Sequence, residues 1–231
     1  MTWTIPNILT VGRIIAAPCV ALVFLVFDRP LADWLAFGLF VAAAVTDFFD
    51  GWLARRLNQT SEIGKMLDPI ADKAMVLIAL LALFLPAMIT GPVNLPYDPT
   101  ADHRLMTAMI GVPAIVIICR EVLVSGLREF LGDVKLPVTN LAKLKTTAQM
   151  IAIGALLLVN ALKWEAIPTP ANAFDSVRTV LRGDAAGGTD PVAILEPVGI
   201  SLLWLAAVLT VITGWDYFRK GMAYIRDREE R

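Results

Sequence analysis

Four aspartates lie at helical spacing around the junction between two strongly apolar segments. They are Asp47, Asp50, Asp68 and Asp72, in the stretch DFFDGWLARRLNQTSEIGKMLDPIAD of residues 47–72. At about 100° per residue, the first two lie about 60° apart on one helix face, and the last two lie about 40° apart on the next helix. Two pairs of carboxylates can therefore converge across a tight helix hairpin.

The chemistry of such a cluster follows from its charge. Four carboxylates brought together repel strongly, and His103, the single histidine of the chain, is far away in sequence. A divalent metal is the natural compensation, and ligands that are all oxygen favour Mg²⁺ or Mn²⁺. Four carboxylates suit a two-metal site, and such sites clamp phosphates. The sequence therefore predicts Mg²⁺ or Mn²⁺ as the cofactor of a phosphate-handling site.

A plainer interpretation is that these aspartates are interfacial acids with basic neighbours. The neighbours would be Arg55, Arg56, Lys65 and Lys73. This alternative requires no particular spacing among the acids, whereas the stretch has a specific one.

The composition indicates an integral membrane protein. The 231 residues are 57% hydrophobic, above the roughly 45 to 50% of soluble domains, and the mean hydropathy is +0.68. Six apolar runs approach or exceed the roughly 20 residues that cross a bilayer as a helix. They cover residues 8–27, 31–54, 67–90, 105–131, 146–164 and 198–218. The expected fold is all-α, with six transmembrane helices in one domain over residues 1–231.

Basic residues predict the orientation of these spans. Of the 20 lysines and arginines, 15 fall on one side and 5 on the other, and the richer side is expected to be cytoplasmic. Both termini and the aspartates then face the cytoplasm from the inner membrane, and residues 91–104 and 165–197 form outward loops. Arg13 interrupts the first run, so residues 1–12 are expected to form a short interfacial segment.

The spacing of the acidic stretch resembles a family motif. It reads D-x-x-D-G-x-x-A-R-x8-G-x-x-x-D-x-x-x-D, and it resembles the motif of the CDP-alcohol phosphatidyltransferases with every fixed position filled. Those positions are Asp47, Asp50, Gly51, Ala54, Arg55, Gly64, Asp68 and Asp72. Members of the family are membrane enzymes with six transmembrane helices, often homodimeric, that transfer a phosphatidyl or related group from a CDP-linked donor to an alcohol and release CMP.

The resemblance implies a role for each matching residue. The four aspartates would hold the metal ions, and Asp72 would also be the general base on the attacking hydroxyl. The cytidine diphosphate would be received by Gly51, Ala54, Arg55 and Ser61.

Segments outside the motif bear on the acceptor alcohol. Residues 118–132 and 140–150 resemble the family members that use sn-glycerol 3-phosphate. The first segment carries Arg120 and Arg128, and the second carries Lys145. A basic pocket of these residues would suit an acceptor with its own phosphate. The resemblance therefore implies transfer of the phosphatidyl group from CDP-diacylglycerol to glycerol 3-phosphate. The further partners expected are membrane lipids, and no nucleic acid.

Other interpretations stay open at this point. Arg120, Arg128 and Lys145 could be ordinary anchors on the cytoplasmic side, and Glu121 lies near the helix face of Arg128 and could pair with it. The acceptor could instead be that of a cardiolipin, phosphatidylinositol-phosphate or phosphatidylserine synthase. From another class, a cation transporter would place acids at the bilayer centre and in repeated segments, whereas these acids lie toward one side.

Overall fold

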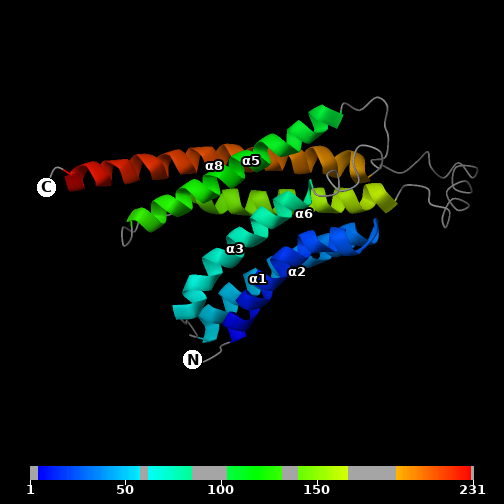
Figure 1. Cartoon of the computed structure of the whole chain (residues 1–231), viewed down its shortest axis with the longest axis horizontal. Coiled ribbons are helices and arrows are strands. Elements are labelled where there is room, and N and C mark those ends of the chain that lie inside the picture. The colour runs from blue at the N-terminus through cyan, green and yellow to red at the C-terminus, as the bar shows by residue number, and fades with distance from the viewer. Residues whose placement is uncertain (1–4, 58–61, 85–102, 132–139, 166–190, 230–231) are drawn as a thin grey trace, which may run out of the picture. The chain divides into compact units, whose positions relative to one another are not determined.

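The described part of the chain is almost entirely helical. The computed structural model describes residues 5–57, 62–84, 103–131, 140–165 and 191–229. Its helices are α1 (Ile5–Val26), α2 (Leu31–Leu57), α3 (Glu62–Ala82), α5 (His103–Leu131), α6 (Asn140–Glu165) and α8 (Pro191–Glu229), as labelled in Figure 1. These ranges contain no strand, which confirms the all-α prediction.

Four of these helices are long and apolar enough to cross a membrane. The qualifying segments are Asn7–Val26 of α1, Ala108–Phe130 of α5, Leu144–Lys163 of α6 and Pro191–Arg226 of α8. They confirm a membrane protein, while the count of six spans stays a prediction. Residues 5–12 continue directly into the rest of α1, so the described part of the predicted interfacial segment is not a separate helix.

The second predicted outward loop, residues 165–197, ends earlier in the structure than expected. The second was expected to run to residue 197, but α8 already begins at Pro191. Proline is well tolerated at the start of a helix, and Pro197 lies inside α8 because membrane helices accommodate the backbone group that a proline leaves unpaired. The prolines near 191–197 therefore did not mark a loop. Most of the two predicted loops lies outside the described residues.

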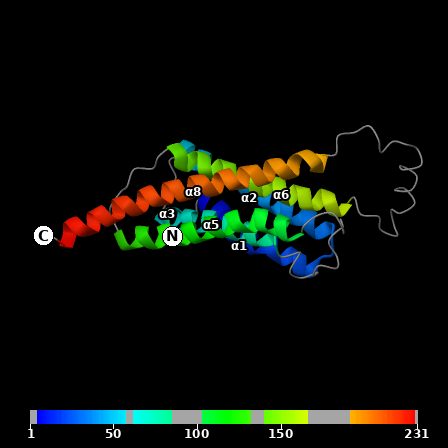
Figure 2. The same ribbon diagram turned by 90° about the horizontal axis from the view of Figure 1, so that it is seen from above.

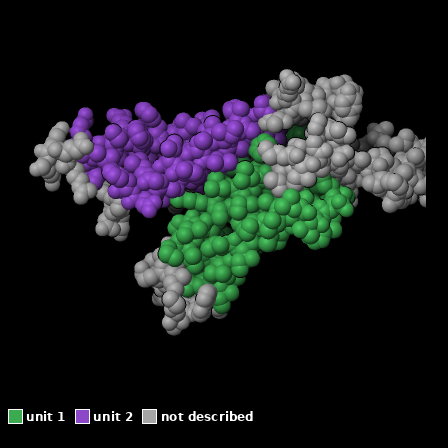
Figure 3. Space-filling model, in the orientation of Figure 1, with its two compact units in different colours: residues 1–98, 154–198 green, residues 99–153, 199–231 purple. Residues whose placement is uncertain are grey.

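The chain divides into two compact units, coloured separately in Figure 3. Unit 1 comprises residues 1–98 and 154–198, and unit 2 comprises residues 99–153 and 199–231. Helices α6 and α8 contribute to both units. The expectation of a single domain stays a prediction.

In unit 1, α1 packs against both α2 and α3 (Figures 1 and 2). Polar contacts show that α1 and α3 run parallel. Thr10 of α1 contacts Asp68 of α3, and further along both helices Arg13 contacts Asp72. Small side chains allow close packing. The buried set includes Ala17, Val20, Ala36, Phe40, Ala71 and Met75.

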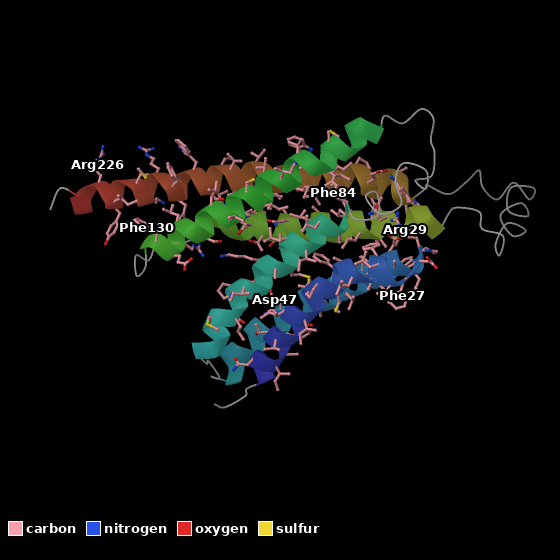
Figure 4. All side chains as sticks on the ribbon, in the orientation of Figure 1. Phe27, Arg29, Asp47, Phe84, Phe130 and Arg226 are labelled. Atoms are coloured by element: carbon pink, nitrogen blue, oxygen red, sulfur yellow. The ribbon has the colours of Figure 1, made fainter. Side chains whose placement is uncertain are left out.

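A buried ion pair closes the turn between α1 and α2. The Arg29 guanidinium donates to both carboxylate oxygens of Asp33, with Nε to Oδ2 at 2.7 Å and Nη2 to Oδ1 at 2.5 Å. The Asp33 side chain is fully buried, so this two-bond pairing offsets the cost of removing its charge from water. Figure 4 shows Arg29 at this turn and Asp47 toward the other end of the hairpin.

In unit 2, α5 and the C-terminal part of α8 run parallel. Trp204 Nε1 donates to the carbonyl of Met109 at 2.9 Å, and further along both helices Arg120 meets Thr213. The apolar core of this unit includes Ile117, Ile153, Leu203, Ala206 and Ala207. Parallel directions for α5 and α8 are expected when α6, the one helix described between them in sequence, runs the opposite way.

Candidate active site

Three of the four predicted aspartates gather around one arginine in unit 1. Arg13 of α1 donates from Nη1 to Asp72 Oδ1 of α3 at 2.9 Å and also to Asp47 Oδ1 of α2. Its Nη2 lies 3.8 Å from Asp68 Oδ1. The Arg13 side chain is only 5% exposed, while the three carboxylates are each about half exposed. Asp47 of the first predicted pair and both aspartates of the second therefore do converge, with a cation from a third helix between them.

Helix α1 presents further polar side chains on the same face. The Thr10 hydroxyl donates to Asp68 Oδ1 at 2.8 Å. Asn7, Thr10 and Arg13 recur every third residue and all three are buried, so they form a polar stripe along an otherwise apolar helix. This stripe was missed at the sequence level, where Arg13 was read only as an interruption of the first span. The spacing N-x-x-T-x-x-R could have revealed it, because three polar residues on one face of a membrane helix need polar partners.

Small residues let α3 approach closely beside the acids. Ala71 is fully buried, with 0% of its surface accessible, and Gly64 is buried one turn before Asp68. Pro69 removes one backbone donor within α3 but does not break the helix. The α3 backbone thus brings Asp68 and Asp72 close to α1.

The donor chemistry of this cluster fits a divalent metal. Three carboxylates share one guanidinium, so the cluster keeps excess negative charge beside exposed oxygen ligands, the kind that Mg²⁺ and Mn²⁺ prefer. Among the side chains that the structure describes, no three acids, histidines or cysteines are already close enough to enclose a metal ion. Arg13 holds the carboxylates instead.

The rest of the motif lies at the end of α2 and just beyond it. Asp50, Gly51, Ala54 and Arg55 belong to the last two turns of α2, which places them on the helix that carries Asp47. Their side chains, like the whole of Ser61, lie outside the described residues. The helix assignment agrees with the predicted spacing, and the individual contacts stay predictions.

Two of the three predicted basic residues, Arg120 and Lys145, form a second cluster with Glu121 in unit 2. Glu121 Oε1 accepts from Lys145 Nζ of α6 and, at 3.1 Å, from Arg120 Nη1. The side chains of Lys145, Glu121 and Arg120 are 6%, 15% and 17% exposed. Such burial is more than simple anchoring at the membrane surface requires.

Arg128 has a different partner from the one that its spacing favoured. Its Nε donates to the Tyr217 hydroxyl of α8 at 3.1 Å, and its guanidinium carbon lies 5.1 Å from the centre of the Tyr217 ring. Glu121 pairs with Lys145 and Arg120 instead. The pair between Arg128 and Glu121 that the sequence left open does not form, because Tyr217 of α8 takes Arg128 while Lys145 of α6 and the neighbouring Arg120 take Glu121.

Comparison with known proteins shows the same family across most of the chain. The family model described as CDP-alcohol phosphatidyltransferase matches residues 3–212. A protein of Cereibacter sphaeroides named CDP-diacylglycerol–glycerol-3-phosphate 3-phosphatidyltransferase is 48% identical over 99% of this chain and 100% of its own length. Proteins with the same name from Rickettsia bellii and Shigella flexneri are 37% and 32% identical, over 95% and 99% of this chain and 96% and 100% of their own lengths. This chain belongs to the CDP-alcohol phosphatidyltransferase family.

Proposed function

We propose that this protein transfers the phosphatidyl group of CDP-diacylglycerol to the 1-hydroxyl of sn-glycerol 3-phosphate, giving phosphatidylglycerophosphate and CMP. One observation carries the proposal: relatives that match nearly the whole chain, one of them 48% identical, are named for this reaction. The membrane helices suit a lipid donor, and the buried basic cluster suits an acceptor that carries a phosphate.

The acidic cluster is the proposed centre of the chemistry. Asp47, Asp50, Asp68 and Asp72 are the residues that would hold Mg²⁺ or Mn²⁺, in a family that generally depends on a divalent metal. When bound, the metal supplies positive charge against the diphosphate. Gly51, Ala54, Arg55 and Ser61 are proposed to receive the cytidine diphosphate part of the donor, and their small side chains and single guanidinium agree with that role.

Asp72 is the proposed general base. The glycerol 3-phosphate hydroxyl forms a new bond to the phosphorus that carries diacylglycerol, and the bond from that phosphorus to the CMP oxygen breaks. The hydroxyl proton passes to a carboxylate oxygen of Asp72. The Asp72 side chain is 58% exposed, so a substrate hydroxyl can reach it, while Arg13 holds its Oδ1 in place.

The acceptor phosphate is proposed to bind Arg120, Arg128 and Lys145. Two arginines and a lysine supply several charge-assisted donors to a phosphate. Lys145 and Arg120 are already held on one carboxylate oxygen. A phosphate that arrived there would meet cations whose positions are largely fixed, which lowers the entropic cost of binding.

The experiment that tests the reaction supplies acceptors in turn. Purified protein with CDP-diacylglycerol and Mg²⁺ or Mn²⁺ receives labelled glycerol 3-phosphate, phosphatidylglycerol, inositol phosphate or serine. CMP release and a labelled lipid are expected with glycerol 3-phosphate alone. Turnover with another of these acceptors, and none with glycerol 3-phosphate, would contradict the proposal.

The membrane setting is proposed on the basic-residue bias and the resemblance. The active site and both termini would face the cytoplasm from the inner membrane, and the protein would form a homodimer. Crosslinking in native membranes, followed by mass determination of the purified protein in lipid nanodiscs, tests the dimer. A single-chain mass in nanodiscs with full activity would refute it.

A further inference from the structure

A face of α8 contacts both arginines of the proposed acceptor site. This face consists of Thr213, Gly214 and Tyr217. Tyr217 lies four residues after Thr213 and three after Gly214, so the three share one side of the helix. The family model ends at residue 212, so the match does not cover this face. Its contacts with α5 lie entirely within unit 2.

The Thr213 hydroxyl accepts a hydrogen bond from Arg120 Nη2 at 3.2 Å. The hydroxyl donates its own proton to the carbonyl of Leu209 at 2.7 Å, one turn back along α8. That internal bond fixes the hydroxyl, so its remaining lone pairs point away from the α8 backbone. Thr213 is 8% exposed, and this hydroxyl is therefore a buried, oriented acceptor for one guanidinium nitrogen.

Gly214 provides the space in which Arg120 lies. A β-carbon at this position would be 3.0 Å from Arg120 Cγ and 3.4 Å from Arg120 Nε. The contact with Cγ is tighter than usual, so the arginine chain would have to give by a few tenths of an ångström. Arg120 Nε is itself buried and has no hydrogen-bond partner among the described residues. The absence of a side chain at Gly214 thus fits the present course of the Arg120 side chain.

Tyr217 holds the second arginine through two different contacts. Its hydroxyl accepts from Arg128 Nε, and its ring lies under the Arg128 guanidinium. The hydroxyl contacts one edge of the guanidinium and the ring contacts one face. Together they fix the plane of the guanidinium, and with it the directions of the other N–H groups. One face of α8 therefore contacts two cations that lie eight residues apart on α5.

We propose that the α8 face of Thr213, Gly214 and Tyr217 positions Arg120 and Arg128 for the phosphate of the acceptor. These three are positioning residues, because they act through the arginines. The inference rests on the proposed acceptor site. Since phosphate recognition by arginine depends on the direction of the guanidinium, a small displacement weakens acceptor binding while leaving the donor lipid unaffected.

The test measures steady-state kinetics of the full chain in lipid nanodiscs. Thr213→Val keeps the shape of the side chain and removes the acceptor, and it should raise the KM for glycerol 3-phosphate roughly 3 to 10-fold. The KM for CDP-diacylglycerol and kcat should stay within about twofold, because the contact serves binding in ground and transition states alike. Thr213→Ser restores the hydroxyl and should return the KM to near that of the unmodified protein.

Glycine variants provide a matched pair. Gly214→Ala should raise the KM for glycerol 3-phosphate by a similar factor, because its new methyl group displaces Arg120. Gly126→Ala is the control, since a β-carbon there would meet nothing within 4 Å. It changes the same residue type in unit 2 and should leave both KM values unchanged.

Arg120→Gln separates this inference from the proposed function. If Arg120→Gln raises the KM for glycerol 3-phosphate while Thr213→Val and Gly214→Ala leave it unchanged, the positioning role is refuted and the acceptor site stands. If Arg120→Gln also leaves it unchanged in folded protein, both are refuted. Should Gly214→Ala fail to fold, the comparison of Thr213→Val with Thr213→Ser decides the matter by itself.

Discussion

Arg13 is the residue whose replacement tests the acidic cluster most directly. Arg13→Gln removes the positive charge that Asp47, Asp68 and Asp72 share but keeps a polar side chain of moderate length. We expect two opposite effects. The metal-free protein should become less stable, and its affinity for Mn²⁺ should rise.

The size of the first effect follows from the contacts that are lost. Arg13 donates two hydrogen bonds to carboxylates, and bonds of this type are worth roughly 1.5 to 3 kcal/mol each. Because the carboxylates are about half exposed, solvent replaces part of the loss, and we take about 2 kcal/mol for the whole. For a chain of this size, such a loss lowers Tm by roughly 4 to 8 °C.

The second effect has the opposite sign because Arg13 competes with a metal ion for the same oxygens. Its charge also repels a divalent cation within a few ångströms, by roughly 1 to 2 kcal/mol even at a water-like dielectric constant. Mn²⁺ should therefore bind Arg13→Gln roughly tenfold more tightly. Electron paramagnetic resonance of Mn²⁺ measures this affinity without turnover, and thermal unfolding with EDTA and with Mn²⁺ measures stability.

Arg29→Gln is the matched control. It removes another buried arginine from an aspartate of unit 1, at the turn between α1 and α2. It should lower Tm equally with and without Mn²⁺ and leave the Mn²⁺ affinity unchanged. If Arg13→Gln weakened Mn²⁺ binding, Arg13 would gather the carboxylates for the metal rather than compete with it, and the reasoning above would be wrong.

Three further predictions follow from the proposed sites. Asp47→Asn should weaken Mn²⁺-dependent binding of CDP-diacylglycerol together with turnover, whereas Asp72→Asn should cut kcat roughly 100 to 10,000-fold with less effect on donor binding; near-normal turnover of Asp72→Asn would remove it as the base. Arg120→Gln should raise the KM for glycerol 3-phosphate roughly 10 to 150-fold at an unchanged KM for the donor, and equal changes in both would favour a general structural role. In a background without the native cysteines, an impermeant thiol reagent added to intact cells should label a cysteine at Ser176 and spare one at Glu229; the reverse pattern would invert the proposed orientation.

The course of the chain could be predicted because one physical requirement dominates it. A segment that crosses hydrocarbon must be apolar over about 20 residues, and that pattern is visible without knowledge of any contact. The ends of the helices could not be read in the same way. Helix α8 has 39 residues from Pro191 to Glu229, and both of its ends lie beyond the apolar run at 198–218 that predicted it.

The grouping of the acids could be predicted, while the pairing of Arg13 with them could not. Asp47, Asp68 and Asp72 lie in one stretch whose helical spacing already brings them together. Arg13 lies 34 residues before Asp47 and 59 before Asp72. Only the packing of α1 against α2 and α3 places it between them. The same holds for Arg128 and Tyr217, which are 89 residues apart in sequence.

Each unit holds a cluster of like charges with one opposite charge from the protein itself. In unit 1 the cluster is acidic and the opposite charge is Arg13; in unit 2 the cluster is basic and the opposite charge is Glu121. Such a charge stabilises the cluster before a ligand arrives. The ligand must then displace this opposite charge or share the cluster with it. The measured affinity is therefore the difference between the attraction of the cluster for the ligand and its attraction for the protein's own charge.

Glu121→Gln tests this argument on the basic side. The amide still accepts hydrogen bonds from Lys145 and Arg120 but no longer repels a phosphate. The variant should lose stability without substrate, and its KM for glycerol 3-phosphate should fall roughly 3 to 10-fold. The control is Glu196→Gln, which neutralises the partner of Lys163 in unit 1 at 2.5 Å and should affect stability alone. A KM that rises in Glu121→Gln would show that Glu121 orients the cations, and that their order matters more to the acceptor than their net charge.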